Sequence, residues 1–151
     1  MEFYIVQLDF RAAFDRESHS GLIFKLKYIG IGSSVVFIYM EFLSNRRQRV
    51  VVDGATSEWI PIVSSMPQGS MLGPLLFIRY TSEMFELVEN RLYAYADDST
   101  LLEVVCKRAD RPAVAASLNR DMTRIHMWCN HWCTILNPNK RMALVVSRSS
   151  G

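Results

Sequence analysis

The sequence predicts an α+β fold, in which an antiparallel sheet carries helices packed on one of its faces. Short β-branched and aromatic segments occur near both ends of the chain and on either side of residues 97–98, which is typical of strands. The segments between them repeat apolar residues at steps of three and four, which is typical of helices. With 151 residues, half of them hydrophobic, the chain has the length and composition of one globular domain.

In the first part of the chain, one strand is followed by two helices. Residues 3–10, FYIVQLDF, are apolar, aromatic and β-branched, so they predict a buried strand. Residues 18–30 predict a helix, because their apolar residues share one face and a glycine ends the pattern. Residues 33–46 predict a second helix, with Ser33 or Ser34 as its N-cap.

The rest of the chain alternates between hairpins and helices. The dipeptide Asp53–Gly54, between two strand-like runs, predicts a hairpin over residues 47–63. A loop rich in proline and glycine then opens a long helix within residues 64–88. The final elements are predicted at 91–105 (strand, tight turn, strand), 111–136 (helix) and 141–147 (strand). Without the small hairpin, this order approximates the split β-α-β arrangement of ferredoxin-like folds, with the first strand and the 91–105 hairpin at the centre of the sheet.

Composition and charge limit the class of protein. The formal net charge is only +2, so a partner rich in phosphate is allowed but not implied. The three cysteines, Cys106, Cys129 and Cys133, argue against a disulfide framework and fit a reducing, intracellular compartment. No apolar run reaches the roughly 18 to 20 residues that span a bilayer, and the N-terminus lacks a secretory signal, so we expect no membrane association.

Three aspartates are expected to converge at one end of the central strands. Asp9 ends the first strand, and Asp97 and Asp98 occupy the tip of the hairpin that should lie beside it. Carboxylates held close together repel one another unless a cation lies between them. Mg²⁺ prefers such oxygen ligands, and two metal ions can support in-line phosphoryl transfer. A second interpretation stays open, since aspartate also favours solvated turns.

Four blocks of sequence, in this order, resemble the palm of a reverse transcriptase, in particular that of the non-LTR (LINE-type) retrotransposons. They are LDFRAAFD at 8–15, MPQGSMLGPLLF at 66–77, YAYADD at 93–98 and LNPNK at 136–140. The ADD triplet alone is a weak signal, whereas the ordered set is specific and extends over nearly the whole chain. The resemblance implies an RNA-directed DNA polymerase that adds a dNTP to a primer 3′-OH with two Mg²⁺ ions, which Mn²⁺ could replace.

The resemblance also implies roles for individual residues. The metal ligands and catalytic residues would be Asp9, Asp97 and Asp98. The residues implied to contact the nucleotide are Phe14 at the position of the sugar gate, Gln68 beside the incoming nucleotide, Gly69 where the backbone approaches it, and Lys140 near the departing pyrophosphate. Simpler interpretations stay open: Phe14 as a core residue, Pro67–Gly69 as a turn before a helix, and Lys140 as a solvated loop lysine.

The resemblance further sets expectations about the whole protein. Residues 1–151 would form a single palm domain that lacks most of the fingers and the thumb, and its partners would be an RNA template, a DNA primer and a dNTP. Such elements act in the nucleus and the cytoplasm. The alternative is a truncated or domesticated copy that is inactive and at most binds nucleic acid or protein. An RNA-templated RNA polymerase is disfavoured by Phe14.

Four further features of the sequence lie outside this set of residues: a possible zinc-binding run, a basic run and two acidic residues. The run HMWCNHWC at 126–133 contains four residues of zinc-binding types, but one helix cannot arrange four ligands tetrahedrally, so we expect no zinc there. The basic run Arg46–Arg49 could contact phosphates or form a solvated face. Glu17 stands where the resembling family has a small apolar residue, and Asp15 is expected to be structural.

Overall fold

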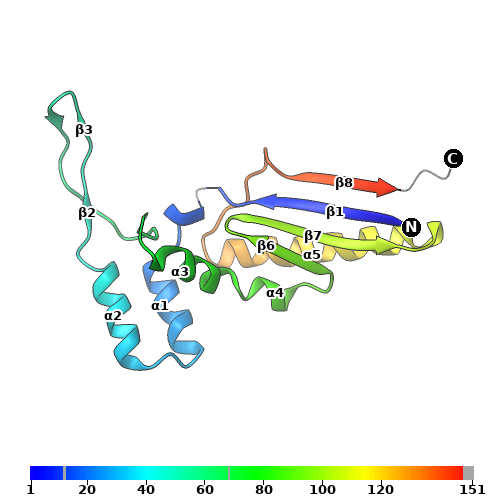
Figure 1. Cartoon of the computed structure of the whole chain (residues 1–151), viewed down its shortest axis with the longest axis horizontal. Coiled ribbons are helices and arrows are strands. Elements are labelled where there is room, and N and C mark those ends of the chain that lie inside the picture. Colours follow the sequence, from blue (N-terminus) through cyan, green and yellow to red (C-terminus); the bar gives the residue numbers. More distant parts are fainter. Residues whose placement is uncertain (12, 68, 148–151) are drawn as a thin grey trace. The chain divides into compact units, whose positions relative to one another are not determined.

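The computed structural model describes residues 1–11, 13–67 and 69–147, and Figure 1 shows the course of the chain. Contacts within the chain group it into two compact units. Met1–Ala13 and Thr81–Gly151 form the first, here called the sheet unit, and Phe14–Tyr80 form the second, here called the helical unit. The single palm domain without fingers and thumb stays a prediction. No helix within the described ranges is long and apolar enough to cross a membrane.

The sheet unit is built on four antiparallel strands (Figure 1). Their bounds are Glu2–Asp9 (β1), Arg91–Tyr95 (β6), Asp98–Val105 (β7) and Met142–Ser147 (β8). The order across the sheet is β6-β7-β1-β8, so the first strand and the second strand of the hairpin are central, as predicted. In the register between β1 and β7, Glu2 lies opposite Val105 and Asp9 lies opposite Asp98.

One long helix, α5 (Arg111–His131), packs against the sheet, and a short helix, α4 (Met84–Leu87), packs against α5 (Figure 1). A 3-10 turn at Arg108–Asp110 leads into α5, which has a proline in its first turn, where that residue is well tolerated. The core consists of buried apolar side chains of the helix and the central strands, namely Leu8, Leu101, Val105, Leu118, Ile125 and Trp128. Burying each fully stabilises the fold by about 1.5 to 3 kcal/mol. The predicted α+β class is confirmed.

The helical unit contains the remaining elements. They are a 3-10 turn at Ala13–Asp15, the helices His19–Tyr28 (α1), Ser33–Leu43 (α2) and Leu72–Thr81 (α3), and the strands Arg47–Gln48 (β2), Val51–Val52 (β3), Ala55–Thr56 (β4) and Ile60–Pro61 (β5). The predicted hairpin is present as two short ladders, in which β2 pairs with β5 and β3 pairs with β4. Asp53 and Gly54 have φ values of 49° and 83°, which the tight turn between β3 and β4 requires.

Three predictions about helix boundaries were wrong. The helix predicted at 111–136 ends at His131, with Trp132 as its C-cap. Ser33 and Ser34 lie inside the first turn of α2, and Gly32 takes the N-cap position without a side-chain hydrogen bond. The single long helix predicted within residues 64–88 is interrupted between α3 and α4. The N-cap prediction relied on the capping preference of serine, which does not determine where the first helical turn begins. Apolar periodicity, in turn, shows which residues are buried but not where the backbone leaves the helix.

A buried carboxylate, that of Glu17, lies inside the helical unit. Its side chain is fully buried, and neither carboxylate oxygen has a hydrogen-bond partner. Burial raises the pKa of Glu17 to about 7, and the negative charge of Asp15 adds to the increase. The equally buried Lys25 is satisfied, because its Nζ donates to the carbonyl oxygen of Tyr80 at 2.6 Å. Glu17 is therefore a carboxylate that costs free energy to ionise in the folded state.

Replacing Glu17 by Met is expected to stabilise the chain at alkaline pH. The folded pKa of about 7 exceeds the ordinary value of 4.5, so stability is highest below pH 4.5 and declines as the pH rises through 7. The rise of the pKa from 4.5 to about 7 corresponds to roughly 3 kcal/mol of unfolding free energy at pH 8. Urea unfolding followed by circular dichroism measures this. A Glu58→Met variant, which makes the same change at an exposed position, is the control.

The gain for Glu17→Met should shrink strongly at pH 5, where the folded carboxyl is protonated. An equal gain at both pH values would mean that apolar packing, and not the cost of ionisation, explains the effect.

Candidate active site

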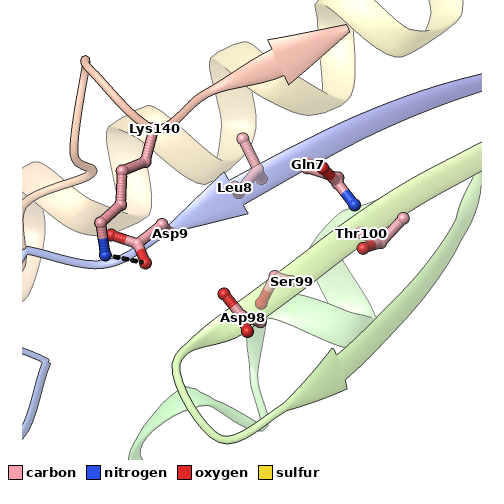
Figure 2. Close-up of a pocket in the computed structure, with 7 residues that line it drawn as sticks. All are labelled: Gln7, Leu8, Asp9, Asp98, Ser99, Thr100 and Lys140. Atoms are coloured by element: carbon pink, nitrogen blue, oxygen red, sulfur yellow. Dashed lines mark hydrogen bonds and ion pairs between the residues drawn. The ribbon is translucent and has the colours of Figure 1, made fainter. Parts of the chain in front are cut away.

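A pocket of about 510 Å³ opens where the end of β1 meets the start of β7, and Figure 2 shows the side chains around it. The lining residues are Gln7, Leu8, Asp9, Asp98, Ser99, Thr100 and Lys140. All of them belong to the sheet unit. Three of the predicted site residues, Asp9, Asp98 and Lys140, therefore share one pocket although they are far apart in the sequence.

The carboxylate of Asp9 is engaged through both of its oxygens. The ammonium group of Lys140 lies 3.0 Å from Oδ1, as the dashed line in Figure 2 marks, and the side-chain amide of Asn137 donates to Oδ2 at 3.2 Å. Asp9 itself is only 8% exposed, whereas the side chain of Lys140 is mostly exposed. Because water screens an exposed ammonium group, this ion pair adds little to stability. Its consequence is local: it neutralises a carboxylate at the pocket.

The loop at residues 135–140 is held along the end of β1 by backbone hydrogen bonds. The N–H of Arg11 donates to the carbonyl oxygen of Ile135 at 2.7 Å, and the N–H of Asn137 donates to that of Asp9 at 2.8 Å. Asn137 was not among the predicted site residues. The LNPNK block contained it, but its contacts with Asp9 depend on tertiary structure and could not be seen in the sequence.

The turn between β6 and β7 separates the two neighbouring aspartates. Ala96 has a φ of 52°, which lets the chain reverse, and Asp98 is the first residue of β7, opposite Asp9. Asp97 lies in the turn, is partly exposed and does not line the pocket. In the described part of the chain, no three His, Cys, Asp or Glu side chains form a group that could hold a metal ion. The role of Asp97 as a third metal ligand stays a prediction.

The charges around the pocket act on Lys140. The hydrogen bond to Asp9, and then the negative charge of that residue, raise the pKa of the Lys140 ammonium group above its usual value. The charges of Asp97 and Asp98 add to the increase. The negative charges of all three aspartates thus act on one ammonium group, and the nucleotide-binding role of Lys140 stays a prediction.

The donors in this pocket suit a hard divalent cation. Asp9 and Asp98 lie directly opposite each other on two antiparallel strands, where two like charges are destabilising unless they are neutralised. Mg²⁺ is usually held by one or two carboxylates together with water and substrate phosphates. Asp9 and Asp98 fit that requirement, and the polar residues Gln7 and Thr100 line the space beside them (Figure 2).

The other three predicted nucleotide-binding residues belong to the helical unit. The ring of Phe14 is half-buried, and its centroid lies 4.6 Å from that of the Phe77 ring, so Phe14 takes part in local packing. Gly69 has a φ of 75°, which favours glycine, and open space lies where a Cβ atom would be. Gln68 lies outside the described residues. The nucleotide-binding roles of Phe14, Gln68 and Gly69 stay predictions.

The basic run Arg46–Arg49 belongs to the ladders of the helical unit. Arg47 and Arg49 are exposed, and the guanidinium carbon of Arg49 lies 4.7 Å from the centroid of the exposed Trp59 ring. Such cation–π pairs occur on surfaces that bind single-stranded nucleic acid and also on ordinary protein surfaces. Both interpretations of this run stay open.

Comparison with known proteins gives consistent results. A family model described as reverse transcriptase (RNA-dependent DNA polymerase) matches residues 2–149. The RNA-directed DNA polymerase from mobile element jockey of Drosophila melanogaster is 30% identical over 95% of this chain and 16% of its own length. The probable RNA-directed DNA polymerase from transposon BS of the same species is 34% identical over 89% of this chain and 15% of its own length. The chain therefore spans about one sixth of the length of these relatives.

Solved structures resemble the fold. Apo telomerase from Candida tropicalis superposes with a TM-score of 0.65 at 11% identity, over 94% of this chain and 28% of that one. A second telomerase structure, truncated from its C-terminal domain, gives a TM-score of 0.57 at 14% identity, over 99% of this chain and 32% of that one. At such low identity these matches show the fold alone, and they confirm the predicted palm architecture. The chain belongs to the reverse transcriptase family, and its curated relatives are RNA-directed DNA polymerases of non-LTR retrotransposons.

Proposed function

We propose that this chain is the catalytic palm segment of an RNA-directed DNA polymerase, which adds dNTPs to a primer 3′-OH on an RNA template. One observation carries the proposal: Asp9 and Asp98 lie directly opposite each other and share a pocket of about 510 Å³ with Lys140. Two carboxylates and an ammonium group are the chemistry needed beside a triphosphate. The names of the relatives, RNA-directed DNA polymerases, support the same activity.

The residues of the pocket divide this chemistry between them. Asp9 and Asp98, joined by Asp97 from the turn, would hold Mg²⁺ as two ions, with Mn²⁺ as a possible substitute. When bound, the metal lowers the pKa of the attacking 3′-OH and stabilises negative charge on the phosphoryl oxygens. Lys140 would neutralise or protonate the pyrophosphate that leaves. The exposed ammonium group of Lys140 lines the same pocket as Asp9 and Asp98, where a phosphate could reach it.

Residues of the helical unit would select the nucleotide. We infer that the ring of Phe14 packs against the sugar and leaves no room for a 2′-OH, so that dNTPs are preferred. Gln68 would contact the incoming nucleotide, and Gly69 would let the backbone approach it. The same proposal includes three kinds of partner, namely an RNA template, a DNA primer, and the fingers and thumb segments of a longer polyprotein. It also includes a location in the nucleus or cytoplasm.

A second candidate function is a retrotransposon remnant that is inactive and binds nucleic acid or protein at most. The observation that favours it is the pair of Arg49 and the exposed Trp59 in the helical unit, a cation–π arrangement that also occurs on surfaces that bind single-stranded nucleic acid.

Primer extension tests the proposal and separates the two candidates. The purified chain is assayed for dTTP incorporation on poly(rA)/oligo(dT) with Mg²⁺ and then with Mn²⁺, beside an Asp97→Ala, Asp98→Ala double variant. We expect incorporation that depends on the metal and is lost in the double variant. If protein shown to be folded by circular dichroism incorporates nothing, the chain is assigned to the second candidate.

A further inference from the structure

The contact between Lys140 and Asp9 has a second consequence for the metal site. We propose that Lys140 is an internal cation that competes with the divalent metal for Asp9, and that Asn137 holds the turn that presents it. The proposal rests on the metal site inferred above. It differs from the role of Lys140 near pyrophosphate, because it concerns the chain before any nucleotide is present.

The geometry around Asp9 carries the first part of the proposal. The ammonium group lies 3.0 Å from Oδ1, a distance at which it takes a position on the carboxylate that a metal ion would otherwise use. Figure 2 shows the Lys140 side chain reaching the Asp9 carboxylate, and Asp98 lines the same pocket. Two cations so close to one carboxylate repel each other strongly. The metal can therefore bind Asp9 only as the ammonium group moves away.

The second part of the proposal, that Asn137 holds the turn, rests on its hydrogen bonds. Asn137 bonds to Asp9 on one side and to later residues of the turn on the other. Its backbone N–H and side-chain amide donate to the carbonyl oxygen and Oδ2 of Asp9 at 2.8 and 3.2 Å. Its own Oδ1 accepts a hydrogen bond from the N–H of Asn139 at 3.1 Å, and its carbonyl oxygen accepts one from the N–H of Lys140 at 3.4 Å. The main chain and the side chain of one residue thus close the turn and anchor it beside the carboxylate that Lys140 contacts.

This arrangement suits a pocket that must exist with and without metal. In the absence of metal, the ammonium group relieves the repulsion between Asp9 and Asp98, which are paired directly across β1 and β7. A bound metal ion would neutralise Asp9 and Asp98 in its place, so the ammonium group would be released into the pocket. Released in this way, the Lys140 side chain is available to an anionic phosphate. Asn137 is a positioning residue here, since it acts through Asp9 and Lys140.

Mn²⁺ binding, followed by electron paramagnetic resonance in the absence of nucleotide, tests the competition. Lys140→Met is expected to tighten Mn²⁺ binding about 5- to 20-fold relative to the unmodified chain, the range expected when a nearby but water-screened charge is removed. Lys107→Met is the matched control, because it removes the same charge from an exposed residue beyond the far end of β7. Unchanged or weaker binding in Lys140→Met would overturn the proposal.

The role of Asn137 is tested by combining substitutions. In an Asn137→Ala background, Lys140→Met is expected to gain much less Mn²⁺ affinity, because the ammonium group is no longer held at Asp9. The same gain in both backgrounds would show that Asn137 does not position Lys140. The circular dichroism spectrum of each variant establishes that it is folded.

Failure of the competition can be told apart from failure of the proposed function. If the unmodified chain binds Mn²⁺ through Asp9 and Lys140→Met binds it no better, only the competition is wrong. If neither protein binds Mn²⁺, the metal site and the competition are both overturned.

Discussion

Replacing Asp9 by Asn is expected to lower metal-dependent primer extension by at least about 10³-fold, or roughly 4 kcal/mol of transition-state stabilisation. The substitution preserves the size of the side chain but removes the charge on which both Lys140 and a metal ion depend. Asp9 is almost buried at the end of β1, where Lys140 and Asn137 hold its carboxylate in place. Asp98, directly opposite, should show a loss of similar size when it is replaced by Asn.

Initial rates of dTTP incorporation at saturating Mg²⁺ and Mn²⁺ measure this loss. Asp15→Asn is the matched control, because it makes the same change only six positions along the chain, at an exposed residue that does not line the pocket. A loss of only a few-fold for Asp9→Asn would remove Asp9 from the catalytic centre. Equal losses in Asp9→Asn and Asp15→Asn would point to a general effect on folding.

Replacing Asp121 by Ala is expected to destabilise the sheet unit by roughly 3 kcal/mol. The Asp121 carboxylate is fully buried on α5. It accepts hydrogen bonds from the N–H of Glu89 at 3.0 Å and from the N–H and side-chain amide of Asn90 at 2.8 and 2.6 Å, and it pairs with Arg124 at 2.9 Å. Removing it would leave the buried N–H of Asn90 without its partner and would break the hydrogen bonds from Glu89 and Arg124, which accounts for the expected cost.

The pKa of Asp121 gives the prediction a second test. Burial opposes ionisation, but the backbone N–H groups of Asn90 and Glu89, the Asn90 amide and Arg124 together lower the pKa of Asp121 below its usual value. The stability that Asp121 contributes should therefore be present above its unfolded pKa and be lost as the pH falls through the lower folded value.

Chemical unfolding at pH 7, followed by circular dichroism, measures the loss of stability. Asp110→Ala serves as the control, since Asp110 lies just before the same helix but its carboxylate is exposed and accepts a hydrogen bond only from the N–H of Lys107. We expect a cost of about 1 kcal/mol or less for the control. Equal costs for both variants would mean that the buried hydrogen bonds of Asp121 add nothing beyond an ordinary cap.

Asp121 also shows how the structure positions the hairpin that contains Asp97 and Asp98. Asn90, which it binds, immediately precedes β6, the strand that leads into Asp97 and Asp98. A single side chain of α5 thus fixes the entry to the hairpin. In the sequence, Asp121 is one polar residue in an amphipathic helix and carries no signal of this role. Its contacts join residues about 30 positions apart, and such pairings are decided by packing.

Local patterns were enough to predict most of the fold and part of the site. Short runs of β-branched and aromatic residues identified the strands, Asp53–Gly54 identified the hairpin turn, and the order of elements placed the strand of Asp9 beside the 91–105 hairpin. The four sequence blocks led to the reverse transcriptase family, which the matching family model confirms. These features are visible in one sequence because they depend on residues close together or on their order along the chain.

Tertiary structure alone decided the rest. It paired Asp9 with Asp98 while leaving Asp97 in the turn, because register and turn geometry determine which of two adjacent carboxylates enters a pocket. It placed Lys140 and Asn137 on Asp9, across about 130 residues of chain. It also buried Glu17 without a partner. Each of these depends on the distance between segments remote in sequence, and periodicity and composition carry no information about that distance.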